Sequence, residues 1–236
     1  MAFKRLLRGG HFSLLSQHRG RQSGLVRAGD RTTAQLISEL SADADVESVE
    51  PNYLRWISSS TPNDPLFSQL WGLQNTGQSV NGTAGTSGDD IKFVGAWSLA
   101  QTSATPVVVA VIDTGADFTH PDLAPSMWTN PNETPANSVD DDSNGYVDDV
   151  YGYDFAGDTS SPTDSGHHGS HVAGTIAAAG NNSLGIIGIN YQAKIMALKA
   201  SSDGDSLTSA AIIEALQYAT MMKNRGVNVV AINASG

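Results

Sequence analysis

The sequence contains no cysteine, so disulfide bonds and cysteine-based catalysis are excluded. It also has no apolar run approaching the roughly 18 residues of a membrane-spanning helix, and we expect no membrane contact. Basic residues are scarce after residue 31. The first 31 residues hold seven of the 13 Lys and Arg against one acid, a net charge of +6, which leaves −17 on the other 205 residues for a total of −11. An acidic surface of this kind repels nucleic acid and favours solubility and cation binding.

A secretory signal is also missing from the first 23 residues. Lys4, Arg5 and Arg8 interrupt the apolar residues near the start, so no apolar core of about 7 to 15 residues exists there. We interpret residues 1–23 as an unassigned, disordered basic leader. A segment that binds RNA or a membrane surface is the alternative interpretation.

Residues 24–56 have the pattern of a small α+β unit. Residues 24–27 and 46–49 have the composition of strands, and residues 32–40 predict an amphipathic helix between them. The polar stretch 57–63 follows, which is typical of a flexible linker that proteases can reach. An ordinary interdomain linker is the alternative for this stretch.

The remaining residues, 64–236, alternate between apolar strands and helices. With 39% hydrophobic residues the chain can bury a sizeable core. Strands are expected at 107–113, 195–199 and 227–233, and helices at 168–179 and 207–225. The face of the second helix expected to be buried consists of Ala211, Ile212, Ala215, Leu216 and Ala219. This alternation predicts an α/β fold of three layers, a parallel sheet with helices on both faces.

Two polar residues stand at the ends of these elements. Asp113 ends the first strand, and His168 begins the first helix. In open α/β sheets functional groups gather at the carboxyl ends of the strands, and a histidine at such a helix start faces those ends. Gly115 follows Asp113 and leaves room for another backbone to approach closely. We therefore expect Asp113 and His168 to lie together as two thirds of a nucleophilic hydrolase site.

Several motifs in the same order along the chain resemble those of the subtilisin-like serine proteases, the subtilases. Asp113-Thr114-Gly115 is similar to their aspartate motif, and the run 168–174 (HGSHVAG) to their histidine motif. Residues 46–53 resemble the end of the family's inhibitory propeptide, and residues 62–78 the start of the mature domain. Residues 119–123 resemble the segment that follows the aspartate. The resemblance covers the chain from about residue 24 onward.

The resemblance implies a serine-type endopeptidase that acts on polypeptides, is inhibited by its own propeptide, is a monomer and is secreted. It implies that His168 takes the proton of a serine nucleophile, and that Asp113 fixes the histidine tautomer and stabilises the imidazolium. It also places the last residues of the chain on the strand whose edge holds the substrate backbone. These substrate-binding residues are Asn233, Ala234, Ser235 and Gly236.

The family's serine motif does not occur in the sequence. In subtilisin the nucleophile lies about 150 residues past the histidine and the oxyanion-hole asparagine about 90 past it, whereas this sequence extends 68 residues beyond His168. We interpret Ser235 as a residue of the substrate strand and not as the nucleophile. We therefore expect the chain to be the front portion of a subtilase, with an incomplete sheet and no activity alone. A noncatalytic pseudoenzyme that binds peptides or calcium is the alternative.

Two further histidines lie beside His168. His167 stands where the family has glycine, so we expect its backbone to avoid a conformation open only to glycine. The resemblance gives His171 a structural role, packed behind the helix start. A zinc cluster of His168, His171 and Asp164 is an alternative, although the spacing does not match H-E-x-x-H and no glutamate base accompanies it.

The acidic run 140–149 (DDDSNGYVDD) is a second chemical signal. It reproduces the first nine positions of a calcium loop, with Gly145 at the sharp turn. The ligands expected for Ca²⁺ are Asp140, Asp142, Asn144, the carbonyl of Tyr146, and Asp148. Tyr151 occupies the place of the closing glutamate, so Asp149 or Asp154 is expected to complete the site. A solvated acidic turn is the alternative, with carboxylates that repel one another.

Overall fold

The computed structural model describes residues 13–17, 24–27, 29, 31–44, 46, 48–51, 61–100 and 106–235. The chain divides into two compact units, Met1–Ile57 and Ser58–Gly236. Gly236, expected on the substrate strand, and most of the expected processing region lie outside the described residues. No helix in the described part of the chain is long and apolar enough to cross a membrane.

The first unit contains a two-stranded sheet and a helix. β1 (Ser13–Gln17) pairs antiparallel with β2 (Gly24–Arg27), and α2 (Thr33–Ser41) follows them. A capping box begins the helix: the Gln35 N–H donates to the Thr32 hydroxyl, and the Thr32 N–H donates to the Gln35 side-chain oxygen. The strand predicted at 24–27 and the helix predicted at 32–40 are therefore present.

Two expectations for this unit are wrong. β1 lies within residues 1–23, where the sequence predicts a disordered leader. The described residues of 46–49, namely Val46, Ser48 and Val49, belong to no strand. In the described part of this unit the sheet contains β1 and β2 alone, and a strand without a partner leaves its backbone hydrogen-bonding groups unpaired, so Val46, Ser48 and Val49 gain no ladder by forming a strand.

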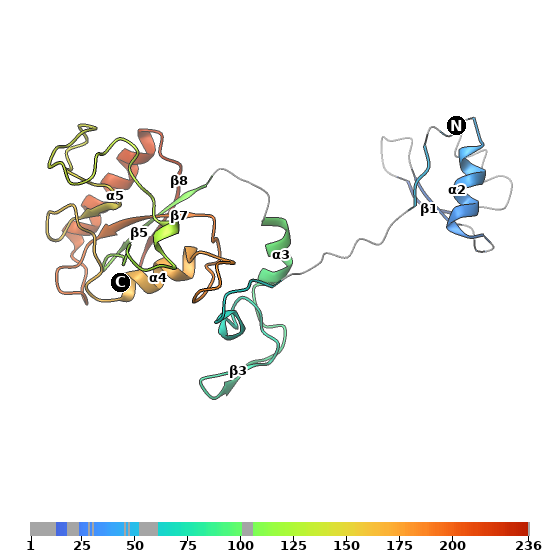
Figure 1. Ribbon diagram of the computed structural model, residues 1–236, viewed down its shortest axis with the longest axis horizontal. Helices are drawn as coiled ribbons and strands as arrows, with labels where there is room; N and C mark the ends of the chain where they lie inside the picture. The colour runs from blue at the N-terminus through green and yellow to red at the C-terminus, as the bar shows by residue number, and fades with distance from the viewer. Residues whose placement is uncertain are drawn as a thin grey trace. The chain divides into compact units, whose positions relative to one another are not determined.

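The second unit is built on a four-stranded parallel sheet with the strand order β6-β7-β5-β8, whose central members lie side by side in Figure 1. The strands are β5 (Val108–Asp113), β6 (Gly152–Asp154), β7 (Lys194–Lys199) and β8 (Val229–Ala234). β5 and β7 are almost wholly buried, as their apolar runs predict. β6 is not predicted from the sequence, because three residues are too few to form a recognisable pattern.

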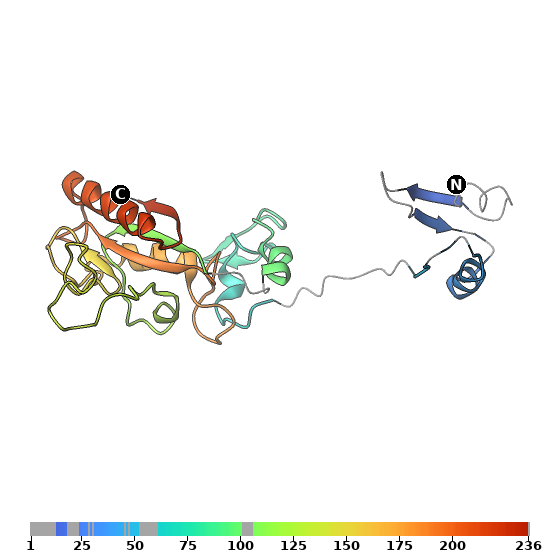
Figure 2. The ribbon, with the colours of Figure 1, turned by 90° about the horizontal axis from the view of Figure 1, so that it is seen from above.

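Helices cover both faces of this sheet, with α4 (His168–Ala177) on one side and α5 (Ser209–Asn224) on the other (Figure 2). The core under α4 includes Val111, Ala173, Ala177, Ile195 and Ala197. The core under α5 includes Ile112, Leu198, Ala211, Ala215 and Tyr218. The alanines on the helices allow a close approach to the sheet. The predicted three-layer α/β fold is confirmed.

The segment before the sheet contains short elements. They are η1 (Phe67–Gln69), the paired strands β3 (Ser79–Val80) and β4 (Thr83–Ala84), and α3 (Phe93–Ala100); η2 (Ala124–Ser126) follows β5.

Aromatic packing and one buried carboxylate hold this segment in place. The ring centroids of Phe93 and Trp97 lie 5.9 Å apart, and those of Trp97 and Tyr191 lie 4.5 Å apart. Asp64 is buried and accepts hydrogen bonds from the backbone N–H groups of Asn181 and Asn182. The start of the second unit is therefore fixed to the loop that follows α4.

Candidate active site

Asp113 and His168 lie together at the carboxyl end of β5. Asp113 is the last residue of β5 and only 1% exposed, whereas the side chain of His168, the first residue of α4, is 56% exposed. His168 Nδ1 lies 2.8 Å from Asp113 Oδ1 and 3.0 Å from Oδ2. A carboxylate only accepts hydrogen bonds, so Nδ1 is the donor and Nε2 of the neutral ring is left as an acceptor. Nε2, the ring nitrogen that can take up a proton, therefore lies on the side of the ring away from the buried Asp113 carboxylate.

The Asp113 carboxylate is held by further donors. The Thr114 N–H donates to Oδ1 over 2.7 Å, and the Ser235 hydroxyl donates to Oδ2 over 3.3 Å. Asn233 Nδ2 in turn donates to the Ser235 hydroxyl over 2.8 Å. Ser235 thus hydrogen-bonds to the aspartate of the pair and not to the histidine, which fits the interpretation that it is not the nucleophile.

Two glycines allow α4 to approach β5 so closely. A Cβ on Gly169 would lie 2.0 Å from the Gly115 carbonyl oxygen and 3.1 Å from Asp113 Cβ. Gly115 has a φ of +115°, and a Cβ there would lie 2.6 Å from the Pro162 carbonyl oxygen. The close backbone approach expected at Gly115 is therefore present, and Gly169 makes a second one.

Asp164 connects the start of α4 to the end of β5. Its Oδ1 accepts from the Thr114 hydroxyl over 2.7 Å and from the His167 N–H over 2.9 Å, and its Oδ2 accepts from the Ser170 N–H and hydroxyl. The Thr114 hydroxyl also accepts the Gly169 N–H over 3.0 Å. Burial opposes the charged form, but hydrogen bonds from Ser170 and Thr114 outweigh it and lower the Asp164 pKa.

From the sequence, Asp164 was expected only as a zinc ligand, and its connecting role was not predicted. No capping signal marks this role in the sequence, because the N-cap residue of α4 is His167 and Asp164 lies three residues before it. Among the described residues, the one group of metal-ligating side chains gathered in space lies elsewhere and does not include Asp164, His168 or His171. The zinc alternative therefore has no support in the geometry.

The two neighbouring histidines differ from expectation. His167 has a φ of +65°, in the left-handed region that favours glycine, so the expectation that its backbone avoids such a conformation is wrong. The hydrogen bond from its N–H to Asp164 helps to hold it there. His171 is exposed, so its expected packing behind the helix start is also wrong.

The electrostatics of the pair favour proton uptake by His168. The hydrogen bond to Asp113 raises the pKa of His168 above its usual value of 6.5, and the negative charges of Asp113 and Asp164 add to this effect. A raised pKa makes the imidazolium easier to form. The pair can therefore take a proton from a nucleophile placed at Nε2 and hold the resulting charge.

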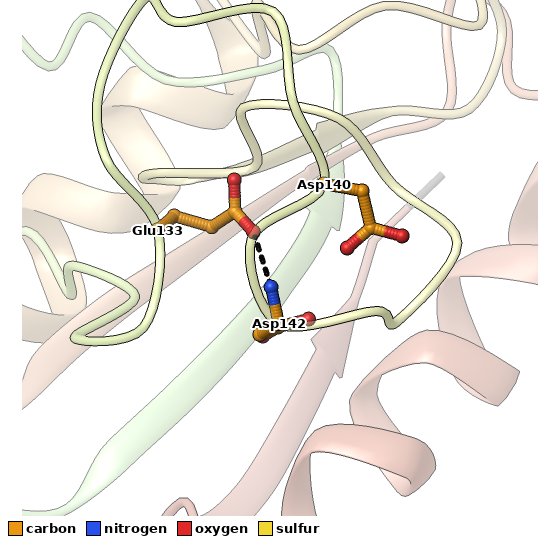
Figure 3. Close-up of side chains that lie close together, drawn as sticks. All are labelled: Glu133, Asp140 and Asp142. Carbon is orange, nitrogen blue, oxygen red and sulfur yellow. Dashed lines mark hydrogen bonds between the residues drawn. The ribbon is translucent and has the colours of Figure 1, made fainter.

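The acidic loop is a second site. The structure brings Asp140 and Asp142 together with Glu133, a residue that the sequence analysis missed (Figure 3). The expected ligand Asp148 is not in this group, and its carboxylate accepts the N–H groups of Asn137 and Ser138. Of the expected loop ligands, only Asp140 and Asp142 are therefore gathered with another carboxylate.

Three other residues expected at the calcium site have partners outside the group with Glu133. The side-chain oxygen of Asn144 accepts the Tyr146 N–H. Asp149, expected to complete the site, is fully buried and accepts from the hydroxyl of Tyr218 on α5. Burial raises the Asp149 pKa. Asp154 is the other residue expected to complete the calcium site, and its Oδ2 lies 3.3 Å from Lys199 Nζ. Asp149 thus connects the loop to α5.

A parallel α/β sheet that holds a buried aspartate hydrogen-bonded to a histidine at the carboxyl end of one strand is an arrangement that can activate a hydroxyl nucleophile. The family model described as the subtilase family matches residues 104–235, which is more than half of the chain. The chain belongs to the subtilase family.

Two curated relatives agree with this assignment. The chain is 39% identical over 123 residues to subtilisin-like protease 1 of Plasmodium berghei (strain Anka), covering 52% of this chain and 20% of that protein. It is 34% identical over 187 residues to the thermophilic serine proteinase of Bacillus sp. (strain AK1), covering 78% of this chain and 36% of that protein. Among solved structures, it is similar to proteases from Pseudoalteromonas arctica PAMC 21717, with 28% identity and a TM-score of 0.44. This similarity covers 68% of this chain and 44% of that one. The chain spans about a fifth of the length of the Plasmodium relative and about a third of the length of the Bacillus relative.

Proposed function

We propose that this chain supplies the aspartate and the histidine of a serine-type endopeptidase. The observation that carries the proposal is the 2.8 Å hydrogen bond between His168 Nδ1 and the buried Asp113, in a chain of the subtilase family. His168 Nε2 is the general base for a serine hydroxyl and then the general acid for the leaving amine. Asp113 keeps the proton on Nδ1 and stabilises the imidazolium. In serine proteases the loss of this role costs about 10⁴ in turnover.

The serine nucleophile is proposed to come from residues outside these 236. In the part of the chain that the structure describes, the hydrogen bonds of the His168 ring go to Asp113 alone. Because the members of such a triad act as a unit, we expect the 236-residue chain to hydrolyse no peptide. The test is a fluorogenic casein assay on the purified chain beside its His168→Ala variant. Hydrolysis by the chain that disappears in the variant would place a nucleophile within it.

The substrate is proposed to be an extended polypeptide that adds a strand along β8 near Asn233–Ser235. β8 is at one end of the strand order, so one of its edges is unpaired within the described sheet. Backbone hydrogen bonds to such an edge recognise polypeptide with little dependence on side chains. The first unit is proposed to act as the inhibitory propeptide, cleaved within residues 57–63, and the protein to be secreted and monomeric.

A noncatalytic peptide-binding protein is the second candidate function. The observation that favours it is the absence, among the described residues, of a hydroxyl hydrogen-bonded to the His168 ring. The two functions differ in what happens to a bound peptide. Mass spectrometry of a peptide library after incubation with the longest natural form of the protein distinguishes them, since the second function predicts retention of peptides without cleavage.

A structural calcium ion is proposed for the acidic loop. Support comes from the gathering of Asp140, Asp142 and Glu133, and hard carboxylate oxygens are the ligands that Ca²⁺ prefers. An ion there neutralises carboxylates that otherwise repel one another. Its contribution is to the stability of the loop, and no step of peptide hydrolysis depends on it.

A further inference from the structure

The sequence contains two asparagine–glycine pairs, Asn81–Gly82 and Asn144–Gly145. An asparagine side chain in such a pair is open to attack by the next backbone nitrogen, because glycine has no Cβ to hinder the approach. We propose that Asn81–Gly82 is a site of spontaneous deamidation in the folded protein, and that the fold protects Asn144–Gly145 from the same reaction. This inference does not depend on the proposed peptidase activity.

Asn81 and Gly82 form the turn between β3 and β4. The backbone φ is +50° at Asn81 and +82° at Gly82, as in the two-residue type I′ turns that an asparagine–glycine pair favours. Both residues are exposed, and no atom lies within 4 Å of the position that a Cβ on Gly82 would take. Within the described structure, neither the Asn81 side chain nor the Gly82 N–H has a hydrogen-bond partner. Both reacting groups are therefore accessible and unengaged.

The hairpin that carries this turn is easily opened. β3 and β4 have two residues each, and in the described structure they pair with each other alone. At the base of the hairpin the Gly85 N–H donates to the Gln78 carbonyl over 3.0 Å. An isolated two-stranded hairpin is only marginally stable, so local opening costs little and lets the turn reach the conformation needed for attack. The nearby apolar cluster includes no buried residue of the hairpin; its buried members are Phe67, Leu73, Phe93, Trp97 and Ile187.

The reaction needs no partner other than water. The Gly82 backbone nitrogen attacks Cγ of Asn81, a new C–N bond forms, and the bond from Cγ to Nδ2 breaks. Nδ2 leaves as ammonia with the proton that the Gly82 nitrogen loses. Water then opens the five-membered imide at either carbonyl and gives aspartate or isoaspartate, each with one new negative charge. Isoaspartate adds a methylene group to the backbone, which is incompatible with the two-residue turn.

The second pair has the same two residue types but is held in place. Asn144 is buried, its Oδ1 accepts the Tyr146 N–H over 2.7 Å, and its Nδ2 donates to Asp149 over 2.7 Å. The attacking group is also engaged, because the Gly145 N–H donates to Asp140 Oδ2 over 2.8 Å. Attack at this pair requires these hydrogen bonds to break first. Each one lowers the population of the reactive conformation by about tenfold.

Incubation of the purified 236-residue chain in mildly alkaline buffer tests the inference. Peptide mass spectrometry follows the gain of about 1 Da that accompanies the change from amide to carboxylate at each pair. In the folded chain we expect Asn81 to react at least about tenfold faster than Asn144. We also expect isoaspartate at residue 81, detected with an isoaspartyl methyltransferase, because direct hydrolysis of the side-chain amide gives aspartate alone.

Two controls separate the fold from the local sequence. In concentrated guanidinium chloride the two pairs are expected to react within about threefold of each other, because the hydrogen bonds that protect Asn144 are gone. Asn81→Gln lengthens the side chain and disfavours the five-membered ring, so it is expected to lose the reaction at residue 81 and leave the rate at Asn144 unchanged. Equal rates at the two pairs in the folded chain, or no isoaspartate at residue 81, would overturn the proposal. A tenfold difference that persists in guanidinium chloride would overturn the protective role of the fold.

Discussion

The buried hydrogen bond between Tyr218 and Asp149 makes a measurable contribution to stability. Tyr218 is 1% exposed at the centre of the α5 core, and its hydroxyl donates to the fully buried Asp149 carboxylate. Tyr218→Phe keeps the ring and its edge contacts with Tyr146 and Phe155. Asp149 then retains only the amide donors of Asn130 and Asn144, so the variant isolates one hydrogen bond to a charged group.

Such a bond contributes about 1.5 to 3 kcal/mol. For a unit of this size each kcal/mol shifts Tm by about 2 to 4 °C, so we expect Tyr218→Phe to lower Tm by about 3 to 12 °C. Tyr153→Phe is the matched control, because the Tyr153 hydroxyl donates to an exposed carboxylate, that of Asp158. We expect the control to cost less than about 1 kcal/mol. Urea unfolding followed by tryptophan fluorescence measures both, and equal costs in the two variants would refute the reasoning.

Two further predictions concern the start of α4. Gly169→Ala places a Cβ 2.0 Å from the Gly115 carbonyl oxygen, and we expect this variant to lose cooperative unfolding. Gly174→Ala is the control, because its Cβ would lie 3.6 Å from the nearest atom, Ile186 Cδ1. We expect the control to be neutral or stabilising by up to about 1 kcal/mol. Asp164→Ala is expected to lower the free energy of unfolding by about 1 to 3 kcal/mol at pH 7. Its pKa is lowered by folding, so this contribution is present above the unfolded value of 3.8 and is lost as pH falls through the folded value. Urea titrations at several pH values between 7 and 2 check this, and a difference between the two proteins that does not shrink as the pH falls below 3.8 would contradict it.

The parts of the fold that the sequence predicts are those with a strong local pattern. The apolar run ending at Asp113 and the small-residue helix beginning at His168 each specify an element and a polar residue at its end. Parallel pairing then brings the two ends together, so the central pair follows from local patterns and one topological rule.

The predictions are wrong where contacts with other parts of the fold determine the structure of a segment. On α5, Leu216 is 39% exposed while Tyr218 and Met222 are buried, because the sheet selects a helix face that periodicity alone does not fix. The described residues of the strand predicted at 46–49 belong to no strand, and no described sheet offers them a partner. His167 is held in the left-handed region by a hydrogen bond from its N–H to Asp164. Asp164 is only three residues away, but it is positioned by the Thr114 hydroxyl, which is distant in sequence.

Glu133 shows why the acidic site was only partly predictable. The loop pattern of alternating oxygens identifies Asp140 and Asp142, because those positions are close in sequence. Glu133 lies on a separate stretch of the loop and reaches them only after the chain turns back, and no spacing rule marks it. The fully buried position of Asp149 is likewise set by contact with α5 and not by the loop.

The most direct test of the central claim is an NMR titration of His168 in the 236-residue chain, with Asp113→Asn as the comparison. We predict a pKa above 6.5 for His168 in the wild type and, at pH values above that pKa, a neutral ring with the proton on Nδ1. Because folding raises this pKa, the pair stabilises the fold below about pH 6.5, and the stabilisation is lost as pH rises through the folded value. Asp113→Asn is predicted to lower the pKa and remove the tautomer preference. An identical pKa and tautomer mixture in both proteins would contradict the pairing of Asp113 with His168.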